Sequence, residues 1–231
     1  MELRTYDVTI TGATPLLHHA DNVPWADRLD EWRKSPAAKG KSVAGDDRTP
    51  PWRWVGNLYT DGQVVTIPAD NIMRCLTEAG AMIVVSGKTT MKKYIQSGLA
   101  ILDPDITLLV NDQAVPVAPI IDMVRDDEAA FADHQRLVEG FGFSLFVKRV
   151  RIGVGKSATK HIRVRPRFDV PWSLQFRVEA FDPKLWEGDP LPLATLFELA
   201  GRFRGLCDWR PGAPSSPGPY GQFSATVKRA K

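Results

Sequence analysis

The chain has 231 residues, of which 43% are hydrophobic and 25% charged, and these proportions exclude a wholly disordered chain and indicate an ordinary globular protein. Its formal net charge of +3 conceals an asymmetry. Residues 1–147 carry 14 Lys and Arg against 20 Asp and Glu, a net charge of −6, whereas residues 148–231 carry 16 against 7, a net charge of +9. Positive charge concentrated in one part of a chain favours a polyanionic partner.

The sequence contains no apolar stretch as long as a membrane span or a secretory signal needs, so we expect a cytoplasmic protein without a membrane partner. Its length fits one domain over residues 1–231, with a mobile insertion at about 20–56 and a basic hairpin at about 148–168. Cys75, one of two cysteines, lies among apolar residues at helical spacing. This pattern favours a buried thiol over a disulfide or a metal ligand.

The first 51 residues predict a strand and a short helix followed by an irregular segment. Alternating polar and apolar residues predict a strand at 8–11, and a short helix is expected at 25–34. Residues 35–51 are rich in Gly, Pro, Ala, Ser and Lys and show no periodicity. This composition predicts a mobile loop.

The next part predicts a turn followed by a helix. Asp61-Gly62 favours a two-residue turn, so we expect a hairpin between residues 58–59 and 64–67. Pro68 then starts a helix, and apolar residues at helical spacing give it a buried face. That face consists of Ile72, Leu76, Ala79 and Ile83.

The rest of the chain contains short β-type segments and two further helical segments. We expect strands at 99–102, 106–110, 114–117, 148–152, 161–165, 172–181 and 223–227. Helices are expected at 126–139 and 193–203. Together these elements predict an α+β fold with the helices on one face of the sheet.

The strongest local signal is the segment KRVRIGVGKSATKHIRVRPRF, residues 148–168, which contains eight Lys or Arg and no acid. Alternation and the tip glycines Gly153 and Gly155 predict a basic hairpin. Clustered cations repel one another unless an anion joins them, so we expect the hairpin to bind a phosphate backbone. A solvated hairpin and an acidic protein partner remain alternatives. The candidate residues are Lys148, Arg149, Arg151, Lys156, Lys160, His161, Arg163, Arg165 and Arg167, of which the last four lie on one face.

Two segments partly match a phosphate-binding loop, namely Gly155-Lys156-Ser157 and Gly87-Lys88-Thr89. Val150 and Met82 stand where the first glycine of that motif is required, which argues against ATP hydrolysis. Exposed lysines near the predicted helix could still meet a phosphate track. They are Lys88, Lys92 and Lys93.

Aromatic side chains could stack on the bases of a single strand. Trp52, Trp54 and Trp209 are the candidates, and Arg210 follows Trp209 directly. A core or loop-anchoring role is an equally good interpretation of each ring.

A catalytic site is not expected. His18-His19 is the only adjacent pair of histidines, and adjacent side chains of an extended segment point to opposite faces. Clustered acids at Asp46-Asp47 and at 126–128 are expected to be solvated. We predict no catalytic residue, no metal and no cofactor.

Four segments together resemble the RAMP superfamily: VTITGATPLLHH, YTDGQVVTIPADNIMRCLTEAG, RVRPRFDVPWSLQF and GLCDWRPGAPSSPGPYGQF. That family includes backbone subunits and RNA-processing endonucleases of CRISPR effector complexes, with relatives in phages and mobile elements. The resemblance implies a modified RNA-recognition-motif (ferredoxin-like) core, a protruding hairpin and head-to-tail assembly along a strand. It also implies a glycine-rich loop, in which Cys207 stands where the family commonly has glycine. Its members here would be Gly205, Leu206, Gly218 and Gly221.

The sequence therefore predicts a non-catalytic protein that binds single-stranded RNA or DNA and forms a head-to-tail homo-oligomer along it, as a CRISPR-type backbone subunit or a phage single-strand-binding protein does. One alternative is a metal-independent RNA endonuclease of the same fold with His18 or His19 as base. The other is a self-assembling structural protein without nucleic acid.

Overall fold

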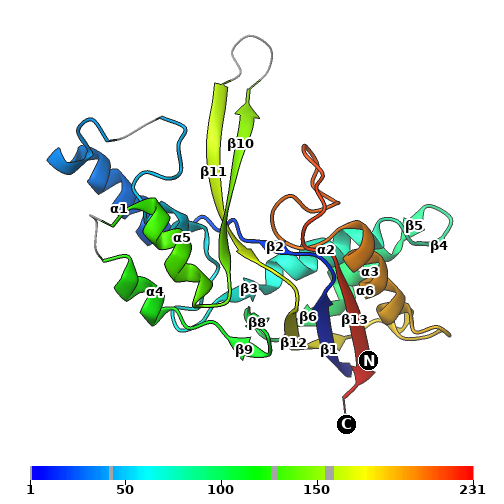
Figure 1. The fold of residues 1–231 in the computed structure, drawn as a ribbon. Helices are drawn as coiled ribbons and strands as arrows, with labels where there is room; N and C mark the ends of the chain where they lie inside the picture. The colour runs from blue at the N-terminus through cyan, green and yellow to red at the C-terminus, as the bar shows by residue number, and fades with distance from the viewer. Residues whose placement is uncertain (1, 42–43, 126–128, 154–158, 231) are drawn as a thin grey trace. The chain divides into compact units, whose positions relative to one another are not determined.

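The computed structural model describes residues 2–41, 44–125, 129–153 and 159–230, and the chain divides into two compact units (Figure 1). The first unit comprises Met1–Leu17, Thr66–Ala114 and Asp169–Lys231. The second comprises His18–Val65 and Val115–Phe168. Helices and antiparallel strands occur together, which confirms the predicted α+β class.

The first unit is built on an antiparallel sheet whose long strands are β1 (Arg4–Gly12), β12 (Trp172–Ala180) and β13 (Phe223–Arg229). β1 lies between the other two, so that Val8 faces Phe176 on one side and Val227 on the other. Every second residue of β1 is apolar and buried, as expected for a strand with one face on the core. The sheet order is β13-β1-β12-β8-β9, and β6 also pairs with β12. The short strands are β6 (Leu99–Ile101), β8 (Leu109–Val110) and β9 (Gln113–Ala114).

Helices α2 (Ala69–Gly80) and α6 (Pro192–Phe203) pack against each other, and α6 packs on β13 (Figure 1). A Cβ at Gly201 of α6 would lie 2.0 Å from the backbone oxygen of Phe223, so only glycine permits this approach. Pro68 precedes α2, which confirms the predicted helix start. Ile72, Leu76 and Ala79 are buried as predicted, as is Cys75, whereas Ile83 lies beyond the end of α2.

Smaller elements complete the first unit. The helix α3 (Met91–Gly98), which the sequence did not predict, follows a two-stranded ribbon of β4 and β5. Their bounds, with those of the other short elements, are β4 (Val84–Ser86), β5 (Thr89–Thr90), β3 (Thr66–Pro68), β7 (Asp105–Thr107), β2 (Leu16–Leu17) and the 3-10 turn η4 (Pro183–Leu185).

The second unit contains the predicted hairpin, formed by β10 (Ser144–Ile152) and β11 (Thr159–Phe168) (Figure 1). The hairpin is longer than predicted, and part of its tip, residues 154–158, lies outside the described residues. Helix α1 (Val23–Lys34) confirms the helix expected at 25–34. The remaining elements are α4 (Ala118–Met123), α5 (Phe131–Glu139), η1 (Pro36–Ala38) and η2 (Arg53–Asn57).

Aromatic rings form the core of the second unit. Phe143 lies between Trp54 and Phe168, with ring centroids 5.8 Å and 5.1 Å away. Trp54 Nε1 donates a hydrogen bond of 3.1 Å to His134 Nδ1. Trp52 and Trp54 are both buried, so neither ring can stack on a base. Of their two interpretations the anchoring role is therefore the one that holds: both rings anchor η2 in the core.

Two predicted elements differ in detail. At Asp61-Gly62 the carboxylate of Asp61 accepts hydrogen bonds from two backbone N–H groups, and Gly62 has φ of +94°. The chain therefore turns here, but over the four residues between Thr60 and Val65 and not over the two predicted. An isolated bridge between Thr60 and Val65 stands in place of the predicted paired strands. Of the helix predicted at 126–139, residues 131–139 form α5, and residues 126–128 lie outside the described residues.

Candidate nucleic-acid interface

The register of the hairpin decides which basic side chains share a face. Lys148 lies opposite Arg163, and Arg151 lies opposite Lys160. Paired residues of antiparallel strands project on the same side, and like charges directly opposite each other destabilise the pair. The hairpin thus carries a like-charge pair on each face.

One side of the hairpin, which we call the outer face, carries Arg149, Arg151 and Lys160, all exposed. The other, which we call the inner face, carries Lys148 and the four alternating residues of β11, so the prediction that these four lie on one face is confirmed. Lys156 lies outside the described residues. The alternating residues of β11 are His161, Arg163, Arg165 and Arg167.

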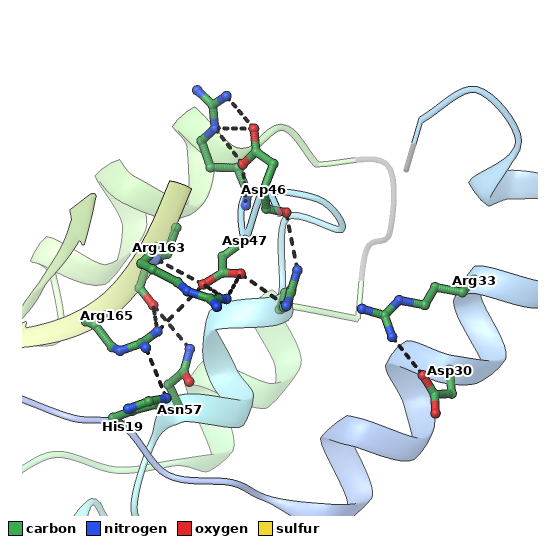
Figure 2. A network of polar contacts seen from close by, with 11 residues as sticks. His19, Asp30, Arg33, Asp46, Asp47, Asn57, Arg163 and Arg165 are labelled. Atoms are coloured by element: carbon green, nitrogen blue, oxygen red, sulfur yellow. Dashed lines mark hydrogen bonds and ion pairs between the residues drawn. The ribbon is translucent and has the colours of Figure 1, made fainter. Parts of the chain in front are cut away.

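The inner face of β11 meets a buried carboxylate, Asp47 (Figure 2). Asp47 Oδ1 lies 3.1 Å from Arg53 Nη2 and 3.1 Å from Arg163 Nη1. Its Oδ2 lies 3.6 Å from Arg165 Nη1. We call these four residues the Asp47 centre, in which three guanidinium groups surround one carboxylate.

Backbone pairing holds Asp47 in this position. Ile162 donates its N–H to the carbonyl of Gly45 at 2.7 Å, and Asp47 donates its N–H to the carbonyl of Ile162 at 3.0 Å. Asp46 and Ile162 form a parallel bridge, so residues 45–47 lie along β11 as a short added strand. The N–H of Val164 also lies 3.4 Å from Asp47 Oδ2.

These contacts correct two predictions. The aspartates at 46–47 are buried, not solvated, because β11 supplies Asp47 with two guanidinium groups and Arg48 supplies Asp46 with another. Arg163 and Arg165 are not simple phosphate contacts, since both pair with Asp47 and only 6% of the Arg165 side chain is exposed. Arg165 Nη2 also lies 3.0 Å from His19 Nε2.

Two charged residues beside Asp47, namely Asp46 and Arg53, have shifted pKa values. Hydrogen bonds from the Arg48 side chain hold the pKa of Asp46 below its usual value, with Arg48 Nη2 2.6 Å from Asp46 Oδ2. Burial lowers the pKa of Arg53, and the charge of Asp47 opposes that shift. Arg53 Nη1 also donates to the backbone carbonyl of Asp46 at 3.3 Å.

Two cavities open beside the Asp47 centre, and both are lined by residues of the second unit alone. The larger has a volume of about 580 Å³ and includes Trp25, Asp21 and His19 with all four residues of the centre. The smaller, of about 520 Å³, shares Arg53 and Arg163 with the larger. Sequence reasoning missed Arg53 as a site residue, because its partner Asp47 was expected to be solvated.

The two adjacent histidines point to opposite sides, as predicted. His19 is exposed at the larger cavity, whereas His18 is buried against Phe168, with ring centroids 4.6 Å apart. Burial lowers the pKa of His18 to about 3, and its Nδ1 accepts the N–H of Tyr59 at 3.3 Å. The alternative in which His18 acts as a base is wrong, because a buried imidazole cannot reach a substrate.

We expect His18 to make the fold sensitive to mild acid. The pKa of His18 is about 6.5 in the unfolded chain and about 3 in the folded protein. Below pH 6.5 the unfolded chain binds a proton that the folded protein does not, so the free energy of unfolding decreases as the pH is lowered. At pH 5 this loss is about 2 kcal/mol, at 1.36 kcal/mol per pH unit. Urea unfolding of the protein and of His18→Gln between pH 7 and 5 checks it. A pH dependence that is the same in both proteins would contradict this role of His18.

In the first unit the structure places the predicted glycine-rich loop after α6. A Cβ at Gly221 would lie 2.0 Å from the Leu206 backbone oxygen, and one at Gly218 would lie 2.3 Å from that of Trp209. Gly205 has φ of +67°, which favours glycine. These glycines therefore permit the loop to pack closely against its own backbone.

Arg210 does not belong to a nucleic-acid surface, which corrects its prediction. It is buried, and its two Nη groups donate to the carboxylate of Glu78 at 2.8 Å and 2.9 Å. This bidentate pair ties the loop to α2. Trp209 is half-buried with φ of +45°, and Cys207 has φ of +62°, a conformation that favours glycine.

The lysines predicted in the first unit are exposed. Lys88 lies between β4 and β5, and Lys92 and Lys93 lie in the first turn of α3. Within the described residues, no three or more His, Cys, Asp or Glu side chains gather as a metal ion would require. In the same part of the chain, every helix is too short or too polar to cross a membrane.

No protein-family model matches the chain, and no curated protein matches it.

Proposed function

We propose that this chain binds single-stranded nucleic acid, RNA or DNA, through the β10–β11 hairpin, without catalysing a reaction on it. The observation that carries the proposal is the concentration of exposed cations on the outer face, where Arg151 lies directly opposite Lys160. A strand of phosphates supplies one negative charge per nucleotide along such a surface. Arg149 adds a further exposed cation to the outer face.

We further propose that the first unit is a modified RNA-recognition-motif core and that the chain is related to the RAMP superfamily. The order β13-β1-β12-β8, with α2 between β1 and β8 in the chain and α6 between β12 and β13, supports this. A ferredoxin-like βαββαβ unit has the same succession of elements. In this account the chain is a CRISPR-type backbone subunit or a phage single-strand-binding protein.

The proposal includes head-to-tail assembly along the strand. Counted by folded unit, the first unit has 13 Lys and Arg against 14 Asp and Glu, a net charge of −1, and the second has 17 against 13, a net charge of +4. This difference favours contact between the second unit of one copy and the first unit of the next. A heterologous contact that does not close produces a filament. Binding to one strand also raises the effective concentration of neighbouring copies.

We expect the particle mass to grow with the length of an added single-stranded oligonucleotide. Mass photometry or electron microscopy over a series of lengths measures it, in low-salt and in high-salt buffer. One copy per strand at every length would contradict assembly and leave simple binding in place. Long filaments in nuclease-treated, high-salt buffer would instead favour the self-assembling structural protein.

A metal-independent RNA endonuclease is the second candidate function, because His19 lines the larger cavity beside Arg165. An imidazole base next to a guanidinium group could deprotonate a 2′-hydroxyl and stabilise the charge that develops on the phosphate. Cleavage of labelled RNA that His19→Gln abolishes would establish this candidate over the non-catalytic proposal.

A further inference from the structure

We propose that the smaller cavity of the second unit binds a phosphate monoester, the terminal phosphate of a nucleic-acid strand. This inference rests on the proposed function, in that a bound strand carries the phosphate. The cavity, which we call the arginine pocket, has a volume of about 520 Å³. Its lining includes Arg33, Arg53, Arg163, His161, Gly45 and Thr49.

The charge of the pocket fits a dianion. Of the described residues, Arg33, Arg53 and Arg163 line it and no acidic residue does. Arg53 and Arg163 share the single carboxylate of Asp47, so once Arg33 exchanges Asp30 for a ligand, three guanidinium groups stand against one carboxylate, an excess of two positive charges. A phosphate monoester carries a charge of about −1.5 to −2 at neutral pH, whereas an internal phosphodiester carries only one negative charge.

Two of the arginines are oriented before any ligand binds. Asp47 Oδ1 takes one Nη group of Arg53 and one of Arg163, both at 3.1 Å. Each guanidinium has five N–H donors in a planar fork, which matches two phosphate oxygens. Because Asp47 is buried, this orientation is fixed within the core. The side-chain entropy that a phosphate site normally loses on binding is therefore reduced.

Arg33 completes the pocket from α1, and its side chain extends towards the Asp47 centre (Figure 2). Its Nη1 pairs with Asp30 at 2.9 Å, and both side chains are about half exposed or more, at 48% and 64%. An exposed pair of this kind contributes little to stability, so Arg33 can exchange Asp30 for a phosphate at small cost.

His161 supplies a fourth polar group to the wall. A Cβ at Gly45 would lie 2.6 Å from His161 Nδ1, so only glycine lets the imidazole pack here. Its Nε2 lies 2.7 Å from Thr159 Oγ1, which holds the ring from the other side. With one ring nitrogen bonded to Thr159 and the other packed against Gly45, His161 serves as a fixed part of the pocket wall beside the arginines.

The larger cavity gives the rest of a terminal nucleotide a place to lie. It shares Arg53 and Arg163 with the arginine pocket and is also lined by the half-buried Trp25. A nucleotide whose phosphate contacts the shared arginines would have its sugar and base in this cavity, where the Arg28 guanidinium lies over the Trp25 ring, 5.0 Å from its centroid. Bases stack both on aromatic rings and on guanidinium planes.

The test compares strands of one sequence that differ only at their ends, with a 5′-phosphate, a 3′-phosphate or hydroxyls at both ends. We expect one phosphorylated strand to bind at least about tenfold more tightly than the hydroxyl strand, since hydrogen bonds to charged groups are worth about 1.5 to 3 kcal/mol. The preferred end identifies the strand polarity. Arg33→Gln should reduce the preference to less than about threefold, because it removes one of the three guanidinium groups.

Arg136→Gln is the matched control, since Arg136 also pairs with an aspartate three residues earlier on an exposed helix face of the same unit. It should keep the full preference. Equal affinity for all three strands would overturn the arginine pocket and leave the hairpin proposal intact. Binding of a nucleoside monophosphate that depends on Arg33, without binding of any strand, would support the pocket and contradict the proposed function.

Discussion

Replacing Asp47 by Asn is expected to lower the free energy of unfolding by about 3 to 5 kcal/mol, the loss seen when one partner of a buried ion pair is removed. Asp47 is buried and faces Arg53, Arg163 and Arg165, so the variant removes the buried negative charge that these three guanidinium groups share. For a chain of this size the melting temperature should fall by roughly 6 to 20 °C. Calorimetry or thermal unfolding followed by circular dichroism measures the change.

Asp7→Asn is the matched control, because Asp7 also pairs with an arginine, Arg177, at 2.9 Å, but both side chains are more than half exposed. Its loss should be at most about 1 kcal/mol. The double variant Asp47→Asn with Arg163→Gln should lose less free energy of unfolding than the sum of the losses in the two single variants. The second change removes one of the buried positive charges that Asp47 faces. If Asp47→Asn melts like Asp7→Asn, the Asp47 centre does not organise the second unit.

The same variant connects stability with binding. Without the Asp47 carboxylate, the three arginines need another anion, so a single-stranded oligonucleotide should raise the melting temperature of Asp47→Asn by more than that of the natural protein. An equal rise in both proteins would place the bound strand away from the Asp47 centre.

The second large effect is expected from the triple variant Arg149→Gln, Arg151→Gln and Lys160→Gln. These three exposed residues form the outer face of the hairpin and lie away from Asp47 in the strand register. Each lost phosphate contact should reduce the slope of log K against log salt by about 0.7, which together amounts to about a hundredfold in affinity at 0.1 M salt. Fluorescence anisotropy with a labelled single strand measures both quantities.

The triple variant should keep nearly its full stability without ligand. Its three changes lie at exposed positions, where a substitution usually alters stability by at most about 0.5 kcal/mol. The control is the exposed triple set Lys184→Gln, Arg202→Gln and Lys228→Gln in the first unit, which changes the net charge equally. If both triple variants lose the same affinity, the loss is due to the change in net charge alone, and the outer face is not part of the binding site.

The hairpin and the main helices could be predicted from the sequence because their signals are local. Alternation over residues 148–168 indicated two strands, and Pro68 with apolar residues at helical spacing indicated α2. The opposite orientations of His18 and His19 follow from the same local geometry. The helices α3 and α4 are only eight and six residues long, too short for a periodic pattern to stand out.

The Asp47 centre could not be predicted, because its contacts join residues far apart in the chain. Arg163 and Asp47 are separated by 116 positions in the chain. The charge run around Arg163 does not indicate an acidic partner, and the irregular segment around Asp47 does not indicate a basic one. The count of basic residues therefore overestimated how much of β11 is available to a ligand, because Arg163 and Arg165 pair with Asp47. The pairing of Arg210 with Glu78, 132 positions away, was missed for the same reason.

The most direct test of this account is an anisotropy titration of the natural protein with a labelled single strand at several salt concentrations. With three or more phosphate contacts on the hairpin, we predict a slope of log K against log salt of about −2 or steeper, together with weaker binding of the triple outer-face variant. No binding at about 50 mM salt, or an affinity that does not change with salt, would contradict the proposal that the hairpin binds a phosphate backbone.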